Sequence, residues 1–256
     1  MKKLVFTLFL LCCSLIAMAD VQHYSWKGNL GDNISFQLDL QVNNVGAVAG
    51  ETTYFRKNGK IAKIPVYGVQ IRYENESSSA LLVNEFDGNK QCGTFFISVD
   101  NNGNFVKGNW SLVDKELNMK NIVELEPDFG KRFFHPTNNI KDAVGKYSFT
   151  YQTGNPNMPE CGGHCYLVAE KGKLHWMMGQ VTPNIAEGEG MANFVDSGFK
   201  GSYQNISFEA YVDEYFVYVW RTNPDEGQVD DWGAWATLEG VYVRELEESG
   251  FDGSVN

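Results

Sequence analysis

The chain has none of the short motifs that identify common catalytic sites. It has no Gly-x-Ser-x-Gly elbow, no His-Glu-x-x-His and no phosphate-binding glycine loop. Its four histidines, His23, His135, His164 and His175, are scattered along the 256 residues and do not indicate a catalytic triad. The sequence therefore predicts no catalytic residue and no cofactor, and it favours a binding or structural role over an enzyme.

Positive charge is scarce. The chain has 21 Lys and Arg against 32 Asp and Glu, a formal net charge of −11, which argues against nucleic acid and anionic membrane surfaces as partners. The imbalance is concentrated in one half. Residues 20–145 carry 15 acidic and 13 basic side chains, whereas residues 146–256 carry 17 acidic and 6 basic. We therefore expect the second half to attract a basic partner.

Long apolar runs are confined to the N-terminus. No later segment approaches the run of about 20 apolar residues that a membrane-spanning helix needs. Residues 1–19 combine a lysine pair, an apolar run and Ala17-Met18-Ala19, which predicts a cleaved secretory signal peptide. Cys12 follows Leu10-Leu11 without the small residues of a lipoprotein box. We therefore expect an exported protein that is periplasmic, cell-surface or secreted.

Three cysteines remain after signal cleavage. In an oxidising compartment Cys161 and Cys165 are predicted to form a disulfide, because Gly162-Gly163 makes the short loop between them pliable. Unpaired thiols are the alternative. A zinc site with nearby histidines is disfavoured, since the spacing is not that of a regular zinc knuckle. We expect no metal. Cys92 is expected to be a small buried hydrophobe.

Short alternating segments dominate the rest of the chain. Residues 34–42, ISFQLDLQV, alternate apolar and polar side chains without interruption, and Asn58-Gly59 is a strong hairpin-turn signal. Similar segments recur every 8 to 12 residues or so, with little helical periodicity between them. The sequence predicts an all-β fold of two tandem antiparallel meander modules, each a small barrel or sandwich.

The rhythm is interrupted once. Residues 126–143 are polar, contain Pro127 and Pro136, and carry Lys131-Arg132-Phe133-Phe134-His135. We expect Lys131 and Arg132 to lie against the acidic second module. The predicted organisation is a signal peptide at 1–19, a β module at 20–125, a linker at 126–143, an acidic β module at 144–246 and a disordered tail at 247–256.

Residues 206–221, ISFEAYVDEYFVYVWR, are expected to form a hairpin that turns at Asp213-Glu214. This register places one apolar set on the core side of the hairpin, namely Ile206, Phe208, Ala210, Val212, Tyr215, Val217 and Val219. The opposite side carries a second set, which we call the aromatic stripe: Glu209, Tyr211, Phe216, Tyr218 and Trp220, with Trp232 and Trp235 as extensions.

The aromatic stripe is the main candidate contact site. Exposed aromatic planes beside a carboxylate would suit a glycan, because sugar rings stack on aromatic faces while carboxylates accept from hydroxyls. If another part of the chain covers this side, the same residues form part of the core and make no contact with a ligand or partner. Both alternatives stay open from the sequence.

Two acidic groupings have ordinary explanations. Asp225, Glu226, Asp230 and Asp231 match no calcium-loop spacing, so they are interpreted as a solvated turn. A carboxylate pair for glycoside hydrolysis could be drawn from Glu209, Asp213, Glu214 or Glu239, but so acidic a module offers many such pairs.

Several segments resemble known exported proteins. In the first module these are GNLGDNISFQLDL, VAGETTYFRKNGKIAKIPVYG, LLVNEFD, CGTFF and FVKGNW. They resemble, over residues 24–125, a meander repeat of exported bacterial proteins that has no assigned activity. GKYSF, residues 186–194 and WATLEGVYVRE resemble closing barrel modules in the structural neighbourhood of small exported lysozyme inhibitors. This resemblance implies architecture and no residue roles.

The sequence is best interpreted as an exported, non-catalytic binding protein. Its acidic, aromatic-rich second module is expected to engage a basic protein, such as lysozyme, or a glycan. The alternatives are a glycan-active hydrolase and a purely structural envelope protein.

Overall fold

The computed structural model describes residues 21–72, 78–181, 185–204, 206–223 and 238–245. Strands dominate these residues and confirm the all-β prediction, and α2 is a single helical turn at Ile140–Ala143. Several predicted features lie outside the described residues: the signal peptide, the tail, the acidic turn at 225–231, Trp232 and Trp235.

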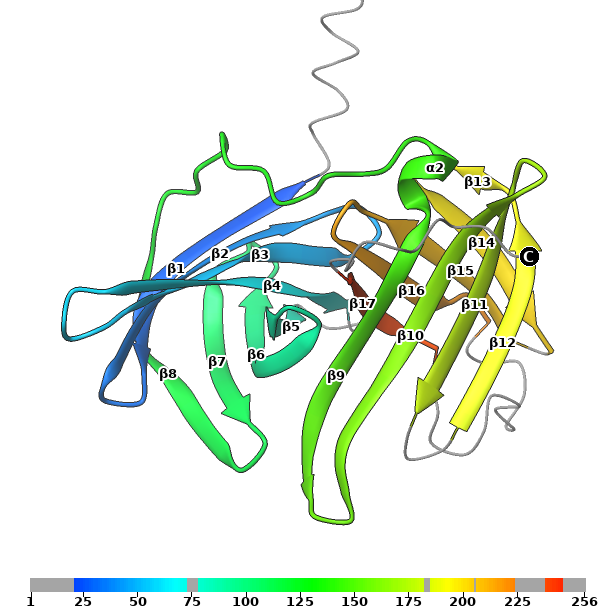
Figure 1. The fold of residues 1–256 in the computed structure, drawn as a ribbon. Coiled ribbons are helices and arrows are strands. Elements are labelled where there is room, and N and C mark those ends of the chain that lie inside the picture. Colours follow the sequence, from blue (N-terminus) through cyan, green and yellow to red (C-terminus); the bar gives the residue numbers. More distant parts are fainter. Residues whose placement is uncertain (1–20, 73–77, 182–184, 205, 224–237, 246–256) are drawn as a thin grey trace, which may run out of the picture.

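The first eight strands form a closed antiparallel barrel (Figure 1). Each strand pairs with the next, and β8 returns to β1, where Trp26 lies opposite Glu124. The strands are β1 (Gln22–Leu30), β2 (Ile34–Val42), β3 (Ala47–Phe55), β4 (Ile61–Arg72), β5 (Ser78–Asp87), β6 (Lys90–Asp100), β7 (Phe105–Leu112) and β8 (Lys115–Glu124).

The alternation of the sequence explains this barrel. In β2 the side chains of Phe36, Leu38 and Leu40 are buried in the interior, while the intervening polar residues face outward. Gly59 takes a positive φ of 77° in the tight turn between β3 and β4, a conformation that favours glycine. Large side chains such as those of Trp26 and Phe95 fill the barrel, so its interior is a packed core.

The second half of the chain forms a second ring of strands. Pairing runs from β9 through β10 and β11 to β12, and from β13 through β14, β15 and β16 to β17, which returns to β9. β12 and β14 lie side by side. The strands are β9 (Gly145–Asn155), β10 (Met158–Glu170), β11 (Lys173–Val181), β12 (Ile185–Ala192), β13 (Phe194–Val195), β14 (Gly198–Tyr203), β15 (Ile206–Val212), β16 (Phe216–Arg221) and β17 (Gly240–Arg244).

The β15–β16 hairpin has the predicted two faces but a wider turn. Val212 pairs with Val217, and Asp213 N–H donates to the Phe216 carbonyl, so the turn spans four residues instead of centring on Asp213-Glu214. The register differs by two residues, which keeps every strand side chain on its expected face. Tyr215 is the exception. It lies in the turn with 42% of its surface exposed, and its placement in the core was wrong.

The two barrels meet through apolar side chains on their outer faces. One cluster joins Ala47, Ala49 and Tyr67 of the first barrel to Phe216 and Val243 of the second. The rings of Tyr67 and Phe216 are 4.9 Å apart between centroids, and Phe216 is fully buried. A parallel bridge between Lys90 of β6 and Thr150 of β9 joins the two rings of strands. The barrels therefore share a core at their junction.

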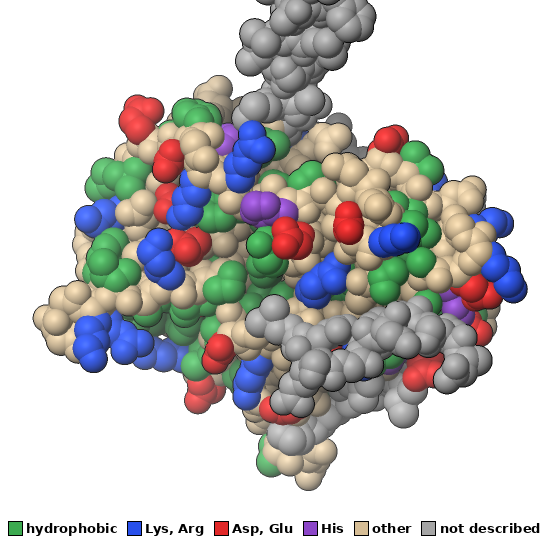
Figure 2. Space-filling view, turned by 45° about the horizontal axis from the view of Figure 1, so that its top comes forward, with side chains coloured by type: hydrophobic (Ala, Val, Ile, Leu, Met, Phe, Trp, Pro, Cys, Tyr) green, Lys and Arg blue, Asp and Glu red, His purple; other side chains and the backbone are tan. Residues whose placement is uncertain are grey.

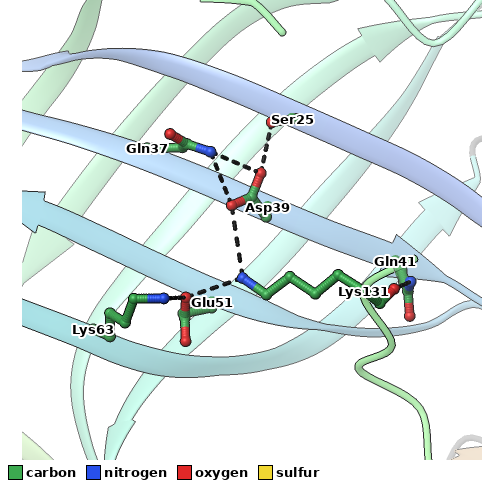
Figure 3. Close-up of polar contacts among 7 residues, drawn as sticks. All are labelled: Ser25, Gln37, Asp39, Gln41, Glu51, Lys63 and Lys131. Atoms are coloured by element: carbon green, nitrogen blue, oxygen red, sulfur yellow. Dashed lines mark hydrogen bonds and ion pairs between the residues drawn. The ribbon is translucent and has the colours of Figure 1, made fainter. Parts of the chain in front are cut away.

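The linker crosses the outside of the first barrel before it enters the second (Figure 1). Lys131 Nζ lies 3.0 Å from Glu51 and 4.0 Å from Asp39, both in the first barrel (Figure 3). The expectation that Lys131 lies against the acidic second module was therefore wrong. The buried Gln41 explains this position, because its amide donates to the Lys131 carbonyl and accepts from Phe133 N–H.

Among the described residues, no helix has the length and apolar character needed to cross a membrane.

The junction predicts a large effect of one substitution. Phe216→Ala should lower the free energy of unfolding by about 3 to 5 kcal/mol, because it opens a cavity between the barrels. Urea denaturation measures this loss. Val106→Ala, which trims a side chain that is 57% exposed on β7, should change stability by less than about 0.5 kcal/mol. Equal losses in the two variants would contradict the shared core.

Candidate functional site

The aromatic stripe lies on the outer face of β15 and β16, and most of it is packed between the barrels. Phe216 contacts Tyr67 and Phe134, and Tyr211 packs edge-on against Phe134 at 6.0 Å. Tyr218 belongs to the same cluster. The structure therefore divides the stripe. The residues nearest the turn pack between the barrels. The far end of the stripe can contact a partner.

Trp220 occupies that far end and lines an open pocket of about 450 Å³. Its ring stacks on Tyr218 at 5.0 Å with an interplanar angle of 25°. The strand pairing places Glu209 directly opposite Trp220, and Tyr211 lies two residues further along β15. The pocket thus brings together Trp220, Tyr211 and Glu209 of the predicted site. The volume falls within the range of small-ligand sites.

The walls of the pocket come from both barrels. Val45, in the turn between β2 and β3, contributes from the first barrel. Val195 and Ser197 contribute from the second, where Asp196 and Ser197 both take positive φ in the tight turn between β13 and β14. Ser197 is held by a hydrogen bond from its hydroxyl to Asn138. The pocket therefore depends on the relative position of the two barrels.

Three charged side chains line this pocket, namely Lys200, Glu209 and the exposed Asp196, and the first two form an ion pair. Lys200 Nζ lies 2.5 Å from Glu209 Oε1 across the β14–β15 pair. The Lys200 side chain is 79% exposed and Glu209 is partly buried. This places one donor and one acceptor beside the aromatic rings. The chemistry suits a polar ligand without negative charge, because Lys200 and Glu209 compensate each other and Asp196 adds a second carboxylate at the pocket wall.

Asp213 lies beyond this pocket, at the point where the linker meets the second barrel. Its carboxylate is fully buried and accepts from the N–H groups of His135 and Tyr215 and from the hydroxyl of Tyr211. Burial raises the pKa of Asp213 to about 6, and the hydrogen bonds and His135 oppose this rise. Glu214 N–H donates in return to the His135 carbonyl. The carboxylate fixes the linker to the hairpin turn.

The geometry gives no support to Glu209 and Asp213 as the carboxylate pair of a hydrolase. Glu209 and Asp213 are four residues apart along one extended segment, which separates them by about 13 Å. Glycosidase carboxylates lie about 5 to 9.5 Å apart. Glu239 accepts a hydrogen bond from the backbone N–H of Arg221, and Glu214 lies in the exposed hairpin turn. Glu209 forms an ion pair with Lys200.

Cys161 and Cys165 do not form the predicted disulfide. Both are buried on the continuous strand β10 and are not linked to each other. Four residues of extended chain place their Cα atoms about 13 Å apart, whereas a disulfide needs less than about 7 Å. Gly162 and Gly163 do not make a loop here. A Cβ on Gly162 would lie 2.3 Å from the Phe149 carbonyl oxygen, so glycine allows β9 and β10 to approach closely.

A buried carboxylate in the first barrel was missed from the sequence. Glu85 is 1% exposed and accepts hydrogen bonds from the Tyr54 hydroxyl and the Trp110 indole, each at 2.8 Å. Burial raises the pKa of Glu85, and these donors oppose the rise. The signal was present, because Leu81, Val83 and Glu85 alternate onto the interior face of β5. The Tyr54 hydroxyl and the Trp110 indole hold this carboxylate in the barrel core.

Within the described ranges, no cluster of three or more His, Cys, Asp or Glu side chains is arranged to hold a metal ion.

Comparisons with known proteins assign no family. No protein-family model matches the chain, and no curated protein matches it. One solved structure that matches is a protein of unknown function from the DUF3598 family of Nostoc punctiforme. It is 13% identical, the match covers 79% of this chain and 78% of that one, and the TM-score is 0.29. So low a score carries no functional argument.

Asp213 predicts a specific dependence of stability on pH. The folded protein binds this proton more tightly than the unfolded chain, because the pKa of Asp213 is raised from 3.8 to about 6. The favourable contribution is therefore complete below about pH 3.8 and is lost as the pH rises through 6. The difference in unfolding free energy between wild type and Asp213→Asn should change by about 3 kcal/mol over this window.

Urea denaturation between pH 4 and pH 7 or so measures this difference. Glu214→Gln, which removes the adjacent exposed carboxyl, is the matched control and should leave the pH profile of the wild type in place. If Asp213→Asn shows the same dependence of stability on pH as the wild type, the titrating proton does not belong to Asp213.

Proposed function

We propose that this protein is an exported, non-catalytic binding protein that holds a neutral glycan in the pocket lined by Trp220, Tyr211 and Glu209. The observation that carries the proposal is the half-buried Trp220 ring, fixed by stacking on Tyr218, at the edge of an open pocket. A pre-ordered aromatic plane costs little conformational entropy when a ligand stacks on it.

The polar groups of the pocket fit the same ligand class. Lys200 offers a donor and Glu209 an acceptor, and Asn193 and Ser197 line the same space. Sugar hydroxyls both donate and accept, so they can use all of these groups. The apolar contributions of Val45 and Val195 match the C–H faces of a sugar ring.

The packing of the stripe favours a glycan over a basic protein. A protein interface of standard size buries roughly 800 Å² on each partner. Phe216 and Tyr218 pack at the barrel junction, which leaves Trp220 and Tyr211 as the aromatic side chains of this stripe that line the pocket. Two rings in a pocket suit a small ligand better than a broad partner surface. The basic protein remains the second candidate because residues 146–256 carry the net negative charge.

Binding of neutral oligosaccharides tests the proposal. Isothermal titration calorimetry of the mature protein should show a ligand whose affinity falls at least about tenfold in Trp220→Ala, since an aromatic contact of this kind contributes about 1.5 kcal/mol. The melting temperature of the variant should stay within a few degrees of wild type. Tyr215→Ala is the matched control, because it removes an exposed aromatic ring of the same hairpin outside the pocket.

The alternatives predict different results. Release of reducing sugar that Glu209→Gln abolishes would identify a hydrolase. Salt-sensitive binding of a basic protein with no oligosaccharide binding would favour the second candidate. If neither glycans nor basic proteins raise the melting temperature, the result would favour a structural envelope protein and contradict the pocket assignment.

A further inference from the structure

Five of the ten Lys and Arg residues of the first barrel lie on one hairpin. Residues 52–73 contain Arg56, Lys57, Lys60, Lys63 and Arg72 and no Asp or Glu. The first four lie at or near the turn between β3 and β4, which projects from the end of the first barrel (Figure 1). Figure 2 shows Lys and Arg side chains gathered at this end of the molecule. A chain with a net charge of −11 thus presents a local basic surface.

The turn presents these cations to solvent in a defined arrangement. Arg56, Lys57 and Lys60 are all exposed, and no ion pair among the described residues joins them to a carboxylate. Arg56 N–H donates to the Lys60 carbonyl, and the Asn58 side chain accepts from Lys60 N–H. Lys63 is the exception, since it pairs with Glu51 at 2.9 Å. The tip therefore carries three uncompensated charges on an ordered turn.

Apolar side chains share the outer face beside these cations. Phe55 lies directly opposite Ile61 in the β3–β4 pair, and Ile61 is 60% exposed. Lys27 Nζ lies 5.1 Å above the Phe55 ring. We call this group of cationic and apolar side chains the basic hairpin surface: Lys27, Phe55, Arg56, Lys57, Lys60 and Ile61.

This combination identifies the chemistry of the partner. We infer that the basic hairpin surface docks the protein peripherally on a lipid bilayer that carries anionic headgroups. Lysine and arginine side chains bind the headgroup phosphates, and Ile61 enters the boundary with the acyl chains. A soluble polyanion would compensate the charges but would leave the exposed apolar side chains in water.

The rest of the molecule does not cancel this attraction. β3 runs from Phe55 at the hairpin to Ala47 at the barrel junction, a distance of about 27 Å. Exposed charges are screened within about 8 to 10 Å at physiological ionic strength. The acidic second barrel lies beyond that junction (Figure 1), so the membrane senses mainly the charge of the hairpin. The inference does not depend on the ligand of the pocket.

Vesicle sedimentation of the full mature chain tests this surface. The protein should sediment with vesicles of phosphatidylcholine that contain about one third phosphatidylglycerol and stay in solution with phosphatidylcholine alone. Raising the salt from about 0.05 to 0.5 M should weaken the association at least tenfold or so. The double variant Lys57→Glu/Lys60→Glu should weaken it by a similar factor.

Two further variants separate the contributions. Ile61→Ser should weaken binding about fivefold and leave the salt dependence unchanged, because it removes only apolar contact. Lys171→Glu/Lys173→Glu is the matched control, since it makes the same charge change at the β10–β11 turn of the second barrel, and it should bind as wild type. Unchanged melting curves establish that each variant is folded.

Three outcomes would overturn the inference. Equal binding to both vesicle types would show that headgroup charge does not matter. Binding of Lys57→Glu/Lys60→Glu at wild-type strength would exclude this hairpin. Capture by soluble polyphosphate without sedimentation on anionic vesicles would assign the surface to a polymer. Because oligosaccharide binding is measured separately, failure here leaves the pocket proposal standing.

Discussion

The arrangement of this protein depends on apolar packing between the outer faces of two barrels. A small barrel needs apolar residues inside and polar residues outside, yet β3, β4, β16 and β17 carry apolar side chains on both sides where the barrels meet. On its own, each barrel would expose this apolar outer face to water. Burial of such surface is the main favourable term in association. Each barrel therefore buries the apolar outer face of the other, and Tyr67 packs against Phe216 at the centre of the contact.

The linker reinforces the same junction with polar contacts. Gln41 binds the linker backbone on the first barrel, and Asp213 binds it on the second. Phe134, between these two points, packs against Tyr211 and Phe216. The segment that looks like a spacer in the sequence is thus part of the core that joins the barrels. The pocket at Trp220 has walls from both barrels because this joint holds them in place.

The faces of the strands could be predicted from the sequence because side-chain alternation has a period of two. That period survives a register error of two residues, which is why β15 and β16 kept their expected faces while Tyr215 did not. The cover over the stripe could not be predicted, because Tyr67 and Phe134 come from distant parts of the chain. Two apolar faces on one hairpin indicate that both are buried, but they do not identify the covering residues.

Local composition misled the sequence interpretation in two other places. The paired glycines beside Cys161 suggested a flexible loop, but they sit in a strand where the neighbouring backbone is close. The charge of the second module suggested a partner for Lys131, but Gln41 positions that residue over Asp39 and Glu51. In both cases a specific contact outweighed the average character of the segment. Trp220 lines the pocket because it ends the stripe beyond the covered part.

The pairing of β8 with β1 and of β17 with β9 has a consequence for the order in which the chain can fold. β1 completes its pairing only with β8, and β9 completes its pairing only with β17, so the closing contacts join the first and last strands of each barrel. Contacts between residues so far apart in the sequence form slowly, because the loop between them must first be closed. A chain that emerges from its N-terminus cannot complete the first barrel before residue 124 is available. It cannot bury the outer face of that barrel until Phe216 has followed, so the half-made protein carries an exposed apolar surface through most of its synthesis.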